Sequence, residues 1–181
     1  MAVFQTILNL FVPLQSPEPE IGAPAAPTTY RIHQLTTGHL DEVLRLNLRC
    51  FRNGENYTKH TFAYLLEEPG TLSYRAVSAE SEMVGFAFAM INDNGAAHLT
   101  TIGVAPEHRR RGVAEQLLQH LERKLALKSI ETIVLEVRVG NAPAQDLYRR
   151  GGYTVVQRIT NYYNNGEDCF LMMKPVTPKP G

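Results

Sequence analysis

A change of hydrophobic period at Pro106 constrains the fold of this chain more than any other feature. Before Pro106, three strand-like runs follow one another at residues 72–79, 83–92 and 97–104, with turn-prone residues between them. These runs predict an antiparallel meander. After Pro106, valine and leucine recur at helical spacing over residues 113–128, which predicts an amphipathic helix.

The rest of the chain supplies further elements on both sides of the meander. We expect strands at 29–35, 132–139, 153–161 and 169–174, and helices at 37–51, after Thr58 and after Asn141. Helices of this kind cover the faces of a sheet. The order predicts an α/β (α+β) fold with a mixed, mostly antiparallel central sheet of about seven strands flanked by about four helices.

The domain organisation follows from length and from proline. A chain of 181 residues, 44% hydrophobic, is enough for one ordinary core. Prolines interrupt residues 15–29, so we expect a flexible extension over 1–29, one domain over 30–175 and a disordered tail over 176–181. The apolar run at 3–14 lacks the basic start and cleavage site of a signal peptide and is too short to span a bilayer.

Charge and cysteine content exclude several classes of partner. Lysine plus arginine and aspartate plus glutamate both total 18, so we expect no nucleic acid and no membrane among the partners. Cys50 and Cys169 lie far apart and lack metal-ligand spacing with the six histidines, which predicts no metal and no disulfide. We expect a cytoplasmic protein that is a monomer or a weak dimer.

The turn between the third meander strand and the following helix carries most of the chemical information. A helix N-terminus presents unpaired N–H groups and a positive dipole end, so it binds pyrophosphate where small residues allow close approach. Gly112 and Ala114 allow that approach, and Arg109, Arg110 and Arg111 add positive charge. From these residues alone, a solvated basic turn before an ordinary helix is also open.

Arg109-x-x-Gly112-x-Ala114 resembles the Arg/Gln-x-x-Gly-x-Gly/Ala signature of the GNAT acetyltransferases, and the resemblance covers nearly all of residues 30–175. It implies acetyl-CoA as cosubstrate, with its pyrophosphate on main-chain amides of the turn and its pantetheine arm along the preceding strand. No P-loop Lys-Ser/Thr follows Gly112, which excludes a nucleoside triphosphatase. The implied cofactor-binding residues are Ile102, Gly103, Val104, Arg109, Arg110, Arg111, Gly112, Val113, Ala114, Glu115 and Asn141.

A second resemblance concerns the branch of the family. Residues 135–138 with Asn141 and Tyr148, and separately Asn161-Tyr162-Tyr163, resemble the ribosomal-protein alanine acetyltransferases and relatives that modify protein N-termini. The resemblance implies transfer of acetyl to an N-terminal α-amino group by direct attack in a ternary complex.

Acetyl transfer to an amine needs a base, an acid and an oxyanion donor. The resemblance implies Glu136 as the base, Tyr148 as the acid for the departing sulfur and His98 as a secondary candidate that relays the proton. The oxyanion is then met by a main-chain N–H near Val104. From the residues alone, Glu136 could instead lie on a solvated strand face, and Tyr148 could simply pack on the sheet.

Aromatic residues are the candidates for the acceptor side of the site. We expect Tyr162 and Tyr163 to form one wall of a peptide slot, and Phe51, Arg52 and Tyr57 the opposite wall. The branch usually has Phe-Pro where this chain has Phe51-Arg52, which leaves the acceptor open. The alternatives are acetylation of a small amine, amino acid or antibiotic, and a non-catalytic acyl-CoA sensor.

Overall fold

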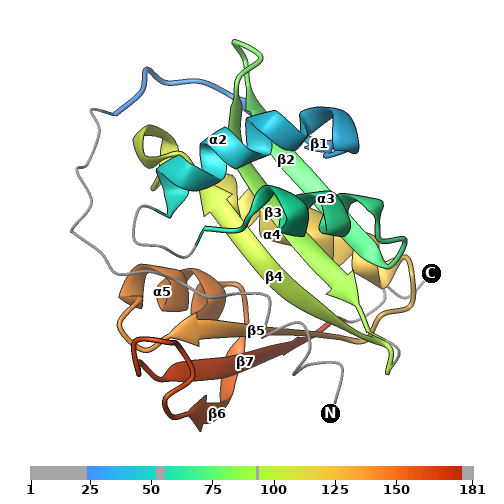
Figure 1. The fold of residues 1–181 in the computed structure, drawn as a ribbon, viewed down its shortest axis with the longest axis vertical. Helices are drawn as coiled ribbons and strands as arrows, with labels where there is room; N and C mark the ends of the chain where they lie inside the picture. The colour runs from blue at the N-terminus through green and yellow to red at the C-terminus, as the bar shows by residue number, and fades with distance from the viewer. Residues whose placement is uncertain (1–23, 52–55, 93, 177–181) are drawn as a thin grey trace.

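The computed structural model describes residues 24–51, 56–92 and 94–176. In this part of the chain seven strands form one sheet, with four α-helices and two short 3₁₀ helices (Figure 1). The elements are β1 Tyr30–Gln34, η1 Thr37–His39, α2 Leu40–Cys50, α3 Lys59–Glu67, β2 Thr71–Ser78, β3 Met83–Ile91, β4 Ala96–Val104, η2 Pro106–His108, α4 Val113–Ala126, β5 Thr132–Arg138, α5 Ala142–Arg150, β6 Thr154–Ile159 and β7 Cys169–Pro175. The predicted fold class is confirmed, and the predicted element order is the observed one.

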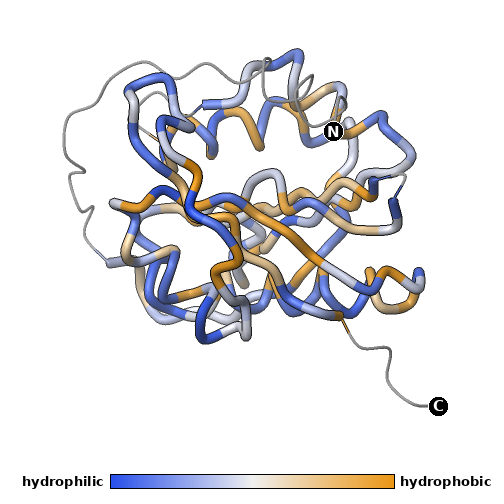
Figure 2. The backbone as a smooth tube through the Cα atoms, turned by 90° about the horizontal axis from the view of Figure 1, so that it is seen from below, coloured by the Kyte–Doolittle hydropathy of each residue, from blue (hydrophilic) through white to orange (hydrophobic). Residues whose placement is uncertain are grey.

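The central strand β3 separates two apolar clusters. Its side chains alternate between the two faces of the sheet, as in any strand. Phe86 and Phe88 join the cluster beneath α2 and α3, while Ala87 and Ala89 join the cluster that includes α4 and α5. Small alanines on one face let α4 approach the sheet closely. Figure 2 shows hydrophobic segments through the middle of the molecule and hydrophilic ones along its outer loops.

Helix starts are set by side chains that the sequence indicated. The Thr58 hydroxyl accepts from the Thr61 N–H at 3.1 Å at the start of α3. The Asn141 carboxamide oxygen accepts from the Ala144 N–H at 3.2 Å at the start of α5. Each cap satisfies a backbone N–H that has no carbonyl partner within its helix.

The sheet order is β1-β2-β3-β4-β5-β7-β6, and every pair except β4–β5 is antiparallel. The parallel pair is short: residues 96–98 pair with residues 132–134, and there the ladder ends. β4 continues beside β3, and β5 continues beside β7. Figure 1 shows the two strands diverging from this point. We call it the fork of the sheet, and among the residues that the structure describes it leaves one edge of β4 without a strand partner.

Candidate active site

His98 and Glu136 meet at the fork. His98 is the last β4 residue in the parallel ladder, opposite Val134, and Glu136 lies two residues further along β5 on the same face. The distance between His98 Nε2 and Glu136 Oε2 is 2.6 Å, and the two side chains are only 16% and 12% exposed. A shielded imidazole–carboxylate contact is a unit that can accept and pass on a proton. The fold therefore brings together two predicted catalytic residues.

Tyr57, Tyr162 and Tyr163 lie within the electrostatic reach of Glu136. Burial, followed by the Glu136 carboxylate, raises the pKa of Tyr57 and of Tyr162 above the usual range. Burial and the Cys169 thiol raise the pKa of Tyr163, with Glu136 adding a smaller effect. All three phenols therefore stay protonated near neutral pH and can donate hydrogen bonds.

The two walls of the predicted slot come from different parts of the chain. Tyr162 and Tyr163 lie in the connection between β6 and β7, residues 160–168, which we call the tyrosine loop. Their rings pack edge to face, with the ring centroids 5.0 Å apart. Tyr57 precedes α3, and its hydroxyl donates to the Thr100 carbonyl of β4 at 2.6 Å. Phe51 packs edge to face against Phe86 in the α2–α3 cluster. Arg52 lies outside the described residues.

Tyr148 lies in the hydrophobic core on the side of the sheet that α4 and α5 cover. Its side chain is buried on α5, and its ring centroid is 5.7 Å from that of Tyr153. Desolvation raises the pKa of Tyr148 above the usual range. The phenol is therefore held in the protonated form that an acid requires. Its role as the acid stays a prediction.

β4 presents the candidate surface for a pantetheine arm. Ile102, Gly103 and Val104 pair with β3 on one side, while the other edge has left the ladder with β5. A Cβ at Gly103 would lie 2.8 Å from two atoms of the buried Phe86 ring, so glycine is required for this packing. A free strand edge pairs readily with an extended chain that contains amides. The cap made by Asn141 is compatible with a further contact to such an arm.

The turn after β4 contains Gly112 as the N-cap of α4. Gly112 has φ +76°, a left-handed conformation that strains other residues, and Arg110 has φ +61°. The N–H groups of Val113, Ala114 and Glu115, in the first turn of α4, have no carbonyl four residues back within the helix. The end of β4 and the start of α4 thus form a corner whose N–H groups can bind an anion, next to the edge of β4 that has left the ladder with β5.

The three arginines of the turn have different surroundings. Arg109 donates to the carbonyls of Val104 at 3.2 Å and Cys50 at 3.0 Å, so it braces the end of β4 against the end of α2. Arg110 is exposed. Arg111 donates to the carbonyls of Ala25 and Ala26, in the described end of the N-terminal extension. The sequence did not distinguish these roles.

Two residues at the site received no predicted role. Arg138 follows Glu136 by two residues on the same face of β5, and its guanidinium lies 3.6 Å from the centre of the Tyr163 ring. Glu167, in the tyrosine loop, pairs with Arg138 at 2.7 Å. In the sequence, the position of Arg138 two residues after Glu136 on one strand was the signal that could have indicated it as a site residue.

The described residues contain no group of three or more histidine, cysteine or acidic side chains arranged to hold a metal. Within the same residues, no helix combines the length and the apolar character that crossing a bilayer requires.

Comparison with known proteins agrees with this geometry. Residues 40–153 match the model of the acetyltransferase (GNAT) family. The chain belongs to the GNAT acetyltransferase family, and the predicted resemblance is confirmed.

Several relatives carry more specific names. The chain is 31% identical over 159 residues to an N-alpha-acetyltransferase of Sulfolobus acidocaldarius. The aligned region covers 81% of this chain and 93% of the relative. It is 28% identical over 148 residues to a putative ribosomal protein bS18-alanine N-acetyltransferase of Bacillus subtilis, covering 80% of this chain and 95% of the relative. The crystal structure of the ribosomal-protein-S18-alanine N-acetyltransferase from Escherichia coli superposes with a TM-score of 0.75 at 28% identity, covering 84% of this chain and 97% of that one.

Proposed function

We propose that this protein transfers acetyl from acetyl-CoA to the N-terminal α-amino group of a protein or peptide. One observation carries the proposal: the His98–Glu136 contact of 2.6 Å lies at the fork of the sheet. There the free edge of β4 meets the tyrosines of the acceptor side. Cofactor arm and acceptor would thus converge on one proton-accepting pair.

The proposed reaction is direct attack in a ternary complex. An N-terminal ammonium loses a proton to Glu136, with His98 passing the proton on. The free amine then forms a C–N bond with the thioester carbonyl, and a main-chain N–H near Val104 stabilises the oxyanion. Collapse of this intermediate breaks the C–S bond, and Tyr148 protonates the departing thiolate. The amide nitrogen then loses its extra proton, and a proton returned to the Tyr148 phenolate restores the enzyme. The products are an acetylated N-terminus and coenzyme A.

The acceptor is proposed from the tyrosines and the relatives. Protonated hydroxyls near Glu136 suit the backbone carbonyls of a peptide, which accept hydrogen bonds. The relatives named N-alpha-acetyltransferase and ribosomal protein bS18-alanine N-acetyltransferase support the same class of acceptor. Both cysteines are free thiols, in keeping with our inference that the enzyme works in the reducing cytoplasm.

The test measures release of coenzyme A thiol by the full-length chain. The acceptors are short peptides with a free N-terminus, the same peptides acetylated at the N-terminus but with an internal lysine, and a panel of small amines. We expect turnover only with free N-termini. Glu136→Gln should lower this turnover by about 10²–10⁴-fold, whereas Glu131→Gln, the same change at an exposed carboxylate before β5, should leave it unchanged.

Other results would replace the proposal. Turnover on small amines alone would assign a small-molecule acetyltransferase. Acetyl-CoA binding without turnover on any acceptor would assign a sensor. Turnover on the blocked, lysine-containing peptides would assign a side-chain acetyltransferase.

A further inference from the structure

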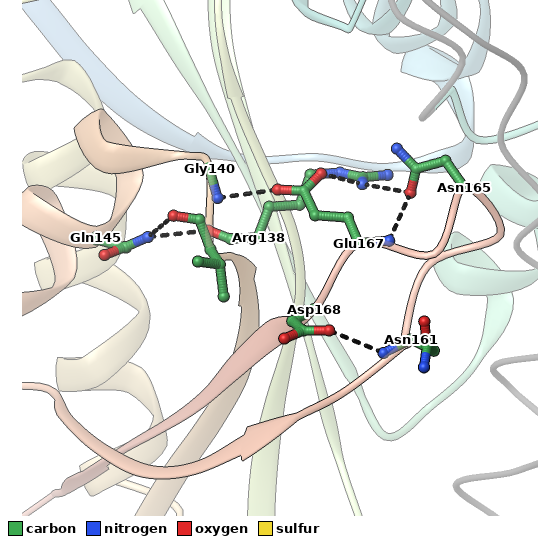
Figure 3. Close-up of polar contacts among 8 residues, drawn as sticks. Arg138, Gly140, Gln145, Asn161, Asn165, Glu167 and Asp168 are labelled. Atoms are coloured by element: carbon green, nitrogen blue, oxygen red, sulfur yellow. Dashed lines mark hydrogen bonds and ion pairs between the residues drawn. The ribbon is translucent and has the colours of Figure 1, made fainter.

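The tyrosine loop is held by two separate sets of contacts. At its neck, the Asp168 carboxylate accepts from the Asn161 N–H at 3.0 Å (Figure 3). The same carboxylate pairs with Arg158 at 2.7 Å. The Asp168 carbonyl accepts from the Val139 N–H at 3.1 Å. These contacts join the two ends of the loop to each other and to β5. The tip of the loop, with both tyrosines, needs other contacts.

Arg138 supplies those contacts from β5. Its guanidinium donates to the Glu167 carboxylate at 2.7 Å and to the Asn165 carboxamide oxygen at 3.2 Å (Figure 3). The same group lies 3.6 Å from the centre of the Tyr163 ring, within cation–π range. One side chain, 14% exposed, therefore contacts three positions of the tyrosine loop.

Glu167 connects this arrangement to the backbone after β5. Its second oxygen accepts from the Gly140 N–H at 2.9 Å. A Cβ at Gly140 would lie only 2.8 Å from that oxygen, so glycine leaves room for the carboxylate. Burial opposes ionisation, but the hydrogen bonds from Gly140 and Arg138 hold the pKa of Glu167 below its usual value. The pair with Arg138 is charged at neutral pH.

The base of Arg138 is itself fixed. The buried Gln145 of α5 donates to the carbonyls of Arg138 at 3.0 Å and Val139 at 2.7 Å (Figure 3). These bonds tie the end of β5 to α5. The backbone of Arg138 is thus paired with β7 and hydrogen-bonded to Gln145 of α5, so the guanidinium reaches the loop from a fixed position.

We propose that Arg138 is a positioning residue for the acceptor: it holds the tyrosine loop so that Tyr162 and Tyr163 stay beside Glu136. The acceptor part of this inference rests on the proposed function. Arg138 bonds both oxygens through one nitrogen, Nη1, while its planar guanidinium lies over the Tyr163 ring. Lysine cannot replace arginine here, because an ammonium has no planar group that stacks on the ring. Arg138→Lys therefore keeps the charge and removes the geometry.

The first readout is independent of any acceptor. Chymotrypsin cleaves after aromatic residues, and cleavage after Tyr162 or Tyr163 requires the loop to open. We expect Arg138→Lys to raise the rate of cleavage at these two bonds about tenfold, because the population of the open loop increases. Mass spectrometry of the fragments identifies the bonds. Arg150→Lys is the matched control: Arg150 is exposed at the end of α5 and takes no part in the loop contacts described above, so its rate should stay that of the wild type.

The second readout is the kinetics of the full-length enzyme. We expect Arg138→Lys to raise the KM for the acceptor about tenfold, the cost of a lost charge-assisted hydrogen bond. The KM for acetyl-CoA and kcat should stay close to wild type, because β4 and the His98–Glu136 pair are unchanged. A general loss of structure would instead move all three constants and the Tm.

Each outcome decides the inference. Unchanged cleavage of the loop overturns it, as does faster cleavage with an unchanged acceptor KM. If the wild type uses only small amines, the proposed function fails, while loop cleavage and the KM for those amines still decide the role of Arg138. If Arg138→Lys does not fold, Glu167→Gln removes the same ion pair with little change in shape and should move both readouts in the same direction.

Discussion

The imidazole Nε2 of His98 lies 2.6 Å from the Oε2 of Glu136, although 38 residues separate them in the chain. The contact exists because β4 and β5 pair in parallel only over residues 96–98 and 132–134. One residue pair further on, the ladder has ended and the two strands have begun to separate. The contact thus lies where β4 leaves β5, with Tyr162 within the electrostatic reach of Glu136.

The contact predicts that His98 and Glu136 act as one unit. Glu136→Gln should lower kcat by about 10²–10⁴-fold, the usual worth of general acid–base catalysis. His98→Gln should cost less, and the double variant no more than Glu136→Gln, because residues that act together are not additive. Steady-state kinetics of the wild type, the two single variants and the double variant measures this. His60→Gln, at an exposed position on α3, is the control. Additive losses would mean that the two side chains work independently.

Tyr148 gives a prediction about the leaving group. Tyr148→Phe removes the hydroxyl and keeps the ring that packs against Tyr153. We expect kcat to fall by about 10²-fold while the Tm and the KM for acetyl-CoA stay unchanged, since only the proton donor is lost. Tyr64→Phe, at an exposed ring on α3, is the matched control. If Tyr148→Phe keeps the wild-type kcat, Tyr148 is not the proton donor and its ring only packs in the core.

Substitutions of Arg109 and Arg111 should have different effects on stability and on the KM for acetyl-CoA. Arg109→Ala removes two hydrogen bonds to the carbonyls of Val104 and Cys50, so we expect a loss of about 1 kcal/mol in the free energy of unfolding. Arg111→Ala leaves those bonds intact and removes bonds only to Ala25 and Ala26 of the N-terminal extension, outside the sheet, so it should raise the KM for acetyl-CoA with a smaller change in stability. Chemical denaturation and cofactor-dependent kinetics of both variants test this. The reverse pattern would assign the phosphate contact to Arg109.

The thiols of Cys50 and Cys169 should lower the free energy of unfolding at alkaline pH. Burial raises the pKa of Cys50 and of Cys169 from 9.0 to about 12. The unfolded chain therefore releases these protons first, so the stabilisation is complete below pH 9 and is lost as the pH rises from 9 towards 12. Each thiol contributes a slope of up to about 1.4 kcal/mol per pH unit.

Urea denaturation at pH 8 and pH 9.5 measures this slope. The variant with both Cys50→Ala and Cys169→Ala should lose less free energy of unfolding between these values than the wild type. Comparing the two chains cancels the contribution of the tyrosines. Equal losses would show that the thiols ionise alike in the folded and unfolded chain.

The sequence by itself determined the elements and the kind of chemistry. Alternation of apolar residues marked β2, β3 and β4, and helical spacing marked α4, because these periods reflect which side chains face a core. The caps Thr58 and Asn141 and the glycine before α4, Gly112, were also readable, since each acts on backbone groups within three residues. Family membership followed from the short spacing between Arg109, Gly112 and Ala114.

Tertiary structure decided which of these residues meet. The His98–Glu136 contact depends on a parallel pairing of only a few residues. The hydrogen bonds of Arg109 to Cys50, of Arg111 to Ala26 and of Arg138 to Glu167 likewise join segments tens of residues apart. A sequence pattern reports the local environment of a side chain. The partner of that side chain across the fold is chosen by the summed packing and hydrogen bonding of the whole chain, and only the folded structure contains that information.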